Sequence, residues 1–160
     1  MEYLLALAPQ LAAVADKYGH LPIHYTRTVR EFRLFSDHSN VLEATNNVGL
    51  STLSILVKNR RIKYTYDTIV ILKDVLVRCP SLIYQIDVFG NTPSHHVANC
   101  YDGNDTTVLQ FEILRTLPEY GCDVNSRNMH GQTPLLLCHN VPVVMAYLKL
   151  EGRIDDKDAR

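Results

Sequence analysis

The chain has 160 residues, of which 46% are hydrophobic and 21% are charged, and its formal net charge is −1. This composition is typical of a globular domain with a packed core, and it excludes an intrinsically disordered chain. A nearly neutral chain also lacks the excess of Lys and Arg that marks nucleic-acid-binding domains, so nucleic acid is not the expected partner.

The first predicted element is a helix from Met1 to Val14. The segment loosely resembles a secretory signal, but Glu2 stands where Lys or Arg is usual and Pro9 interrupts the apolar run. No segment approaches the roughly 20 apolar residues of a membrane span. The four cysteines form no CxxC pair, which favours reduced thiols. We therefore expect a protein of the cytoplasm or nucleus, without a membrane span.

Four segments of similar sequence follow this helix, at 16–24, 46–54, 87–95 and 128–136. Each contains Asp or Asn, two variable residues, Gly, one variable residue and then a predicted helix start. A glycine at this place indicates a backbone position with positive φ, which closes a tight turn. Pro9 and Pro80 occupy the same relative place before the first and third segments.

The first helix of each copy is predicted to begin directly after its glycine. Thr92 and Thr133 are favourable N-cap residues, and each is followed by a proline, which the first helical position tolerates. Ser51 can cap the second copy in the same way. Leu21 has no hydrogen-bonding side chain, so we expect a weaker helix start in the first copy.

Second helices are predicted at 68–78, 108–119 and 142–150, where apolar residues recur at helical spacing. Gly121 follows the middle one at the place of a C′ glycine. Gly152 follows the last one in the same way, so we expect that helix to end before Gly152.

The repeated openings resemble the D-x-x-G-x-T-P-L-H motif of the ankyrin-repeat family, and the resemblance covers nearly the whole chain. It implies an all-α ankyrin-repeat solenoid of about four helix pairs with hairpin-like loops, preceded by one extra N-terminal helix. His24 and His95 fall at the motif's His position, where the family's side chain braces the loop through hydrogen bonds. The implied single domain, 1–160, divides into a partial repeat at 1–15 and repeats at 16–45, 46–86, 87–127 and 128–160.

Two repeats are longer than the family's period. Successive loop glycines are 30, 41 and 41 residues apart, so the second and third repeats each carry about eight extra residues. We expect these insertions at 59–67 and 100–107, between the two helices of each repeat. The first is basic with interleaved tyrosines: it could bind phosphate, nucleic acid or an acidic partner, serve as a nuclear-localisation signal, or be a solvated loop. Its basic patch consists of Arg60, Arg61, Lys63, Tyr64 and Tyr66.

One cluster of reactive residue types needs an explanation. His95, His96, Cys100 and Asp102 lie close in sequence and could indicate a thiol–imidazole pair or a metal site. The repeat motif already accounts for His95, and a zinc site would need a second paired cluster. The chain also contains no phosphate loop and no nucleophile elbow. We therefore predict no catalytic site, no metal and no cofactor, and a protein that is not an enzyme.

The resemblance implies that the chain binds another protein on a concave surface formed by loop tips and inner helices. Aromatic and Met side chains at loop tips favour an interface, although they could also pack on the neighbouring loop. We expect Phe89 to be the strongest anchor. The variable positions of the motif are the predicted protein-binding residues: Lys17, Tyr18, His20, Asn47, Val48, Leu50, Val88, Phe89, Asn91, Met129, His130 and Gln132.

Three more specific or different functions remain open. The chain resembles in length a short IκB-type inhibitor of Rel-family transcription factors, of the kind that a virus or pathogen encodes. It could be a nucleic-acid or phosphate binder that uses the basic insertion, or a regulatory ankyrin segment of a larger enzyme or channel. Residues 17–78 hold ten Lys or Arg against five Asp or Glu, and 79–160 hold six against ten, so charge could steer the partner.

Overall fold

The computed structural model describes residues 8–38, 41–58, 65–100, 107–139 and 141–158. Regular structure in these ranges is helical. Thr45 and Ser51 form an isolated bridge, and no strand is present in the described residues. The all-α prediction is therefore confirmed for this part of the chain.

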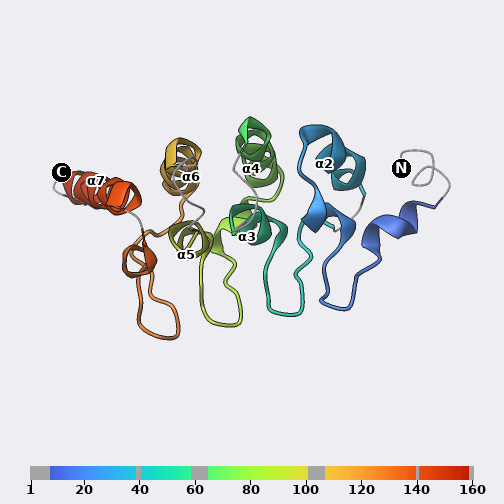
Figure 1. Cartoon of the computed structure of the whole chain (residues 1–160), viewed down its shortest axis with the longest axis horizontal. Helices are drawn as coiled ribbons and strands as arrows, with labels where there is room; N and C mark the ends of the chain where they lie inside the picture. The colour runs from blue at the N-terminus through green and yellow to red at the C-terminus, as the bar shows by residue number, and fades with distance from the viewer. Residues whose placement is uncertain (1–7, 39–40, 59–64, 101–106, 140, 159–160) are drawn as a thin grey trace.

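The helices form a row of four layers, where a layer means one loop and the two helices that follow it. Figure 1 shows α2, α4, α6 and α7 along one side of the row, the shorter first helices beside them, and the loops projecting on the opposite side. The layers consist of η2 (Pro22–Tyr25) with α2 (Val29–Ser36), α3 (Thr52–Val57) with α4 (Tyr66–Arg78), α5 (Pro93–Ala98) with α6 (Thr107–Glu119), and η4 (Pro134–Leu137) with α7 (Val141–Asp158).

Two short 3-10 helices precede loops of this row, η1 (Pro9–Ala13) and η3 (Pro80–Tyr84). Both begin at a proline and contain the same two backbone hydrogen bonds, as the correspondence of Pro9 and Pro80 predicts. The described part of the predicted helix over Met1–Val14 differs from the prediction: it is a short 3-10 helix that begins at Pro9 and ends at Ala13. Residues 1–7 lie outside the described residues.

The caps of the first helices differ from the prediction. Ser51 caps α3 as expected, since its hydroxyl accepts the Ser54 N–H at 3.2 Å. Thr92 and Thr133 occupy N-cap positions, but no side-chain cap hydrogen bond forms at either. The Thr92 hydroxyl lies 2.8 Å from Nδ1 of His95, which also accepts the Thr92 N–H at 3.1 Å.

The second helices also depart from prediction at one place. α7 continues through Gly152 to Asp158, because a glycine inside a helix costs only about 1 kcal/mol and no proline follows to stop it. Gly121 does end α6: its φ is 93°, and the next residue's N–H bonds back to Leu117. The second helix of the first repeat, expected from four helix pairs but given no range, is α2, whose start carries a Thr28–Glu31 capping box.

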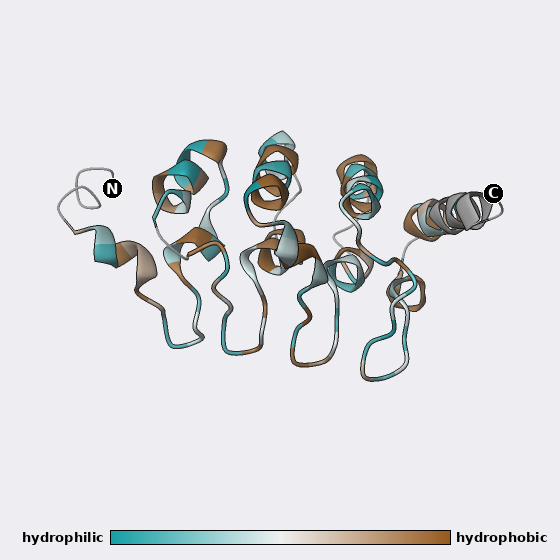
Figure 2. Cartoon of the chain, turned by 180° about the vertical axis from the view of Figure 1, so that it is seen from behind, coloured by the Kyte–Doolittle hydropathy of each residue, from teal (hydrophilic) through white to brown (hydrophobic). Residues whose placement is uncertain are grey.

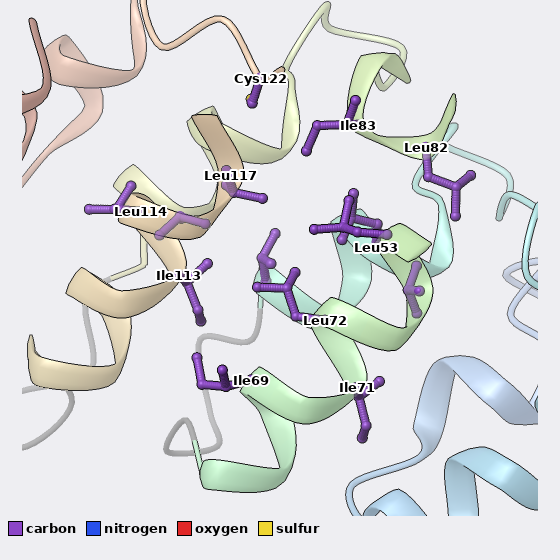
Figure 3. Packing of buried hydrophobic residues seen from close by; sticks show 14 of the residues in the cluster. Leu53, Ile69, Ile71, Leu72, Leu82, Ile83, Ile113, Leu114, Leu117 and Cys122 are labelled. Atoms are coloured by element: carbon purple, nitrogen blue, oxygen red, sulfur yellow. The ribbon is translucent and has the colours of Figure 1, made fainter. Parts of the chain in front are cut away.

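The core lies between the two rows of helices and continues from layer to layer. Figure 2 shows hydrophobic residues concentrated in the helices and at the tip of the third loop. Leu53, Leu72 and Leu117 are completely buried, and each contributes about 1.5–3 kcal/mol relative to an exposed side chain. In Figure 3, Ile69 lies between α4 and α6, and Ile71 lies on the side of α4 toward α2.

A buried tyrosine fixes α7 to α5. The Tyr147 hydroxyl donates to the Ser94 carbonyl at 2.8 Å and lies 2.9 Å from the Ser94 Oγ. Burial raises the pKa of Tyr147 well above its usual value, so the hydroxyl keeps its proton. The fourth layer is thus attached by a satisfied polar contact as well as by apolar packing.

Candidate protein-binding surface

Each of the four loops is held by the Asp or Asn with which it opens. The Oδ1 of this residue accepts the N–H groups of the second and fourth residues after it at 2.8–3.1 Å. The loop glycine's N–H also bonds to the carbonyl of the same residue at 2.9–3.0 Å. Because these bonds are local, all four loops have the same shape. The residues are Asp16, Asn46, Asp87 and Asn128.

The loop glycines have φ values of 71–78°, which confirms the predicted positive φ. At Gly90 the close approach of the next loop adds a second requirement. A Cβ added to Gly90 would lie 3.0 Å from the Met129 backbone nitrogen. Glycine therefore permits both the turn and the contact between adjacent loops.

Backbone hydrogen bonds join successive loops into one row. In each pair, the residue two before the glycine donates its N–H to the carbonyl of the residue just before the preceding glycine. Backbone polar groups at the loop tips are thereby hydrogen-bonded to the neighbouring loop, whereas the side chains there face solvent. The bonds run from Asn47 to Tyr18, from Val88 to Val48 and from Met129 to Phe89, at 3.0, 3.1 and 3.0 Å.

Apolar side chains occupy equivalent places on three of the loop tips. Tyr18, Val48 and Phe89 directly precede their glycines and are 58%, 40% and 52% exposed. Met129, on the fourth loop, is 72% exposed. The Lys17 ammonium lies 4.9 Å from the centroid of the Tyr18 ring, a cation–π distance. We call these five residues the tip row; they form a ridge that remains exposed to water in the free chain.

Four of the predicted binding residues have other roles. The prediction is wrong for Leu50, which is buried because it has no polar group to pair with the next loop and gains by leaving water. The three polar residues at the same loop position are partly buried and bond to the loop-opening asparagines. These contacts are His20 Nε2 to Asn46 at 3.1 Å, Asn91 Oδ1 to Asn128 at 2.9 Å, and Gln132 Oε1 to Asn128 at 3.4 Å.

The eight other predicted residues lie at loop tips. Of these, the apolar members stand out, since polar side chains at a tip are already well solvated. The eight residues are Lys17, Tyr18, Asn47, Val48, Val88, Phe89, Met129 and His130, and all are exposed.

Two buried histidines brace the loops from below, as the resemblance implies. Nδ1 of His24 accepts the Leu21 N–H at 3.0 Å, and Nδ1 of His95 accepts the Thr92 N–H at 3.1 Å. Nε2 of His95 lies 2.9 Å from the Gln132 carbonyl of the next loop. Burial lowers the pKa of His24 to about 4 and also lowers that of His95, so both rings are neutral at pH 7.

The predicted basic patch falls almost entirely outside the described residues. This applies to Arg60, Arg61, Lys63 and Tyr64. Tyr66 is the first residue of α4 and is exposed, so it belongs to the row of second helices and not to the loop tips.

The described members of the His–Cys–Asp cluster take part in separate structural contacts. The Cys100 Sγ donates to the Val57 carbonyl at 3.2 Å, and His96 Nε2 lies 3.3 Å from Asp87 Oδ2 in a buried pair. Asp102 lies outside the described residues. Within the ranges that the structure describes, no three His, Cys, Asp or Glu side chains are placed to hold a metal ion.

The cysteines are all free, and two have strongly shifted pKa values. Burial raises the pKa of Cys122 to about 11 and that of Cys138 to about 12. These groups are therefore neutral thiols at pH 7, a form that is a poor nucleophile.

Neither a membrane-spanning helix nor a match to known proteins points to the function. No helix of the described ranges is both long and apolar enough to cross a membrane. No protein-family model matches the chain, and a search of curated proteins finds no similar sequence.

Proposed function

We propose that the chain is an ankyrin-like solenoid that binds a partner protein across the tip row, with Phe89 as the principal anchor. In this proposal the protein is an intracellular binding module and not an enzyme. An adaptor, an IκB-like inhibitor and a regulatory segment all act by binding a protein, so the identity of the partner distinguishes them.

The repetition of one loop geometry supports the ankyrin-like part of the proposal. All four loops have the same Asx hydrogen bonds and a positive-φ glycine, and each loop is bonded to the next. Figure 1 shows the layers side by side with their loops on one side, as expected when each repeat contacts only its neighbours.

The single observation that carries the binding proposal is the exposed apolar tip row on a hydrogen-bonded backbone. Tyr18, Val48 and Phe89 stay exposed and do not join the hydrophobic core. Exposed aromatic and Met side chains gain most when a partner removes them from water. Because the loop backbones are already ordered, binding loses little further backbone entropy.

Phe89 has the best-supported position in the row. Its own N–H donates to Asp87 Oδ1 at 2.9 Å, and its carbonyl accepts the Met129 N–H at 3.0 Å. Its neighbour Val88 is bonded in turn to Val48 of the preceding loop. A phenylalanine held in this way presents a large apolar area with only two side-chain torsions to fix. Truncation to alanine should therefore weaken binding by about 2 kcal/mol, or roughly 30-fold in Kd.

The test has two steps. Tagged wild-type protein captures the partner from a cell extract, and the purified pair is then measured by isothermal titration calorimetry. Phe89→Ala should weaken binding by the factor given above without changing the thermal melt, because the side chain is half exposed.

Tyr66→Ala is the matched control, since Tyr66 is an exposed aromatic residue on α4, away from the loops. It should leave the Kd unchanged. If Tyr66→Ala weakens binding and Phe89→Ala does not, the partner contacts the second helices and not the loop tips, and the proposal is wrong.

A further inference from the structure

A groove runs between two of the second helices, on the side of the molecule away from the tip row. It lies between α2 and α4 and has a volume of about 280 Å³. Val29 and Phe32 line it from α2, and Ile71 and Val77 line it from α4. Phe32 and Ile71 are buried and form its floor, whereas Val77 is exposed at its edge. The position of Ile71 on the α2 side of α4 is visible in Figure 3.

Two cations stand on the walls of this groove. Arg33 on α2 and Lys73 on α4 line it and are both exposed. Neither takes part in an ion pair among the residues that the structure describes. Asp74 also lines the groove, but its carboxylate accepts from Arg78 Nε at 3.1 Å.

The other carboxylates of these two helices and their caps are likewise engaged within the protein. Glu31 accepts the N–H groups of Arg27 and Thr28 at 2.8 and 3.1 Å, in the capping box of α2. Asp67 accepts the Val29 N–H at 3.1 Å, and Asp37 accepts from Arg78 at 2.8 Å. These hydrogen bonds leave the carboxylates charged, but among the charged side chains that line the groove the positive ones, Arg33 and Lys73, outnumber the negative Asp74, which is paired with Arg78.

The dimensions and lining of the groove indicate what it can bind. Its volume is slightly below the roughly 300–1,000 Å³ of small-molecule pockets, so it suits a few side chains better than a whole ligand. Single-stranded nucleic acid commonly stacks its bases on exposed aromatic rings, and Phe32, the aromatic residue of the lining, is completely buried.

We propose that the α2–α4 groove binds an acidic amphipathic helix of a partner protein. Apolar side chains on one face of that helix cover Val29, Phe32, Ile71 and Val77, and its flanking Asp or Glu side chains lie beside Arg33 and Lys73. This site is separate from the tip row, so it does not depend on Phe89.

The test uses labelled synthetic helices and fluorescence anisotropy with the full chain. The first peptide has leucines at helical spacing flanked by glutamates. A second has lysine for every glutamate, and a third has serine for every leucine. Only the first should bind, and added salt should weaken it because exposed charges are screened.

Variants locate the binding site. The double substitution Arg33→Glu with Lys73→Glu should weaken binding about tenfold, since two attractions become repulsions at exposed positions. Val77→Ser should weaken it several-fold, and this residue is exposed enough for the fold to tolerate the change. Lys149→Glu, an exposed lysine on α7, and Phe89→Ala should have no effect.

Four results would overturn the proposal: no binding of the first peptide, equal binding of the second or third, an equal loss with Lys149→Glu, or an unchanged Kd in the double variant. A single-stranded oligonucleotide that binds more tightly than the first peptide and is lost in the double variant would also overturn it, in favour of a nucleic-acid site.

Discussion

Replacing Gly90 and, separately, Gly131 by alanine measures how much the contact between loops contributes to stability. The two glycines have nearly the same φ, 75° and 71°, so the strain of placing an L-residue there is the same in both variants. This strain is roughly 1–2 kcal/mol. The loss of glycine's freedom in the unfolded chain is also shared, so it cancels in the comparison.

The surroundings of the two glycines differ. A Cβ on Gly90 would lie 3.0 Å from the Met129 nitrogen and 3.3 Å from the Met129 Cγ, whereas a Cβ on Gly131 meets nothing within 4 Å. Gly90→Ala must therefore shift the Met129 backbone by a few tenths of an ångström, which weakens the bond from the Met129 N–H to the Phe89 carbonyl. That bond contributes about 1 kcal/mol. We expect the free energy of unfolding to fall by roughly 1–2 kcal/mol in Gly131→Ala and by roughly 2–3 kcal/mol in Gly90→Ala.

Equilibrium urea unfolding followed by circular dichroism gives both values, provided that the transitions share one m-value. The affinity for the partner that binds the tip row offers a second readout, because Gly90→Ala also moves the loop that carries Phe89. If Gly131→Ala costs as much as Gly90→Ala, the bonds between loops contribute nothing measurable and the reasoning about a rigid row fails.

Three further predictions concern buried polar groups, each measured by urea unfolding. The folded pKa of His24, about 4, lies below its ordinary 6.5, so His24 favours folding above pH 6.5 and this stability is lost as the pH falls toward 4. The loss should reach up to about 3 kcal/mol and should shrink in His24→Gln; an unchanged pH dependence in that variant would contradict the role of the ring. Tyr147→Phe should cost about 1–2 kcal/mol, because it leaves the buried Ser94 without its hydroxyl partner, and a loss near zero would mean that α7 is held by apolar packing alone. Ser51→Ala should cost about 1 kcal/mol through loss of its cap, while Thr133→Ala, which has no side-chain cap bond, should cost clearly less; the reverse order would show that the caps are assigned incorrectly.

Features that depend on near neighbours in the chain were predictable from the sequence. The positive φ of Gly90 follows from Asp87 three residues earlier, because the carboxylate bonds to backbone N–H groups within the same loop. The helices α4 and α6 follow from apolar periodicity, and their predicted ranges agree with the structure to within two residues. The capping box at Thr28 and Glu31 was also readable and would have revealed α2.

Features that join distant residues were decided only by the tertiary structure. Nε2 of His95 meets the Gln132 carbonyl because the fourth loop packs beside α5, a contact between residues far apart in the sequence.

The two candidate surfaces show the same division. The sequence by itself determined which residues stand at the loop tips, because turn chemistry acts over a few residues. It did not determine the α2–α4 groove. Arg33 and Lys73 lie on different helices and line one groove only because α2 packs beside α4. Contacts between residues of different layers follow from the packing of those layers, and local sequence preference does not encode them.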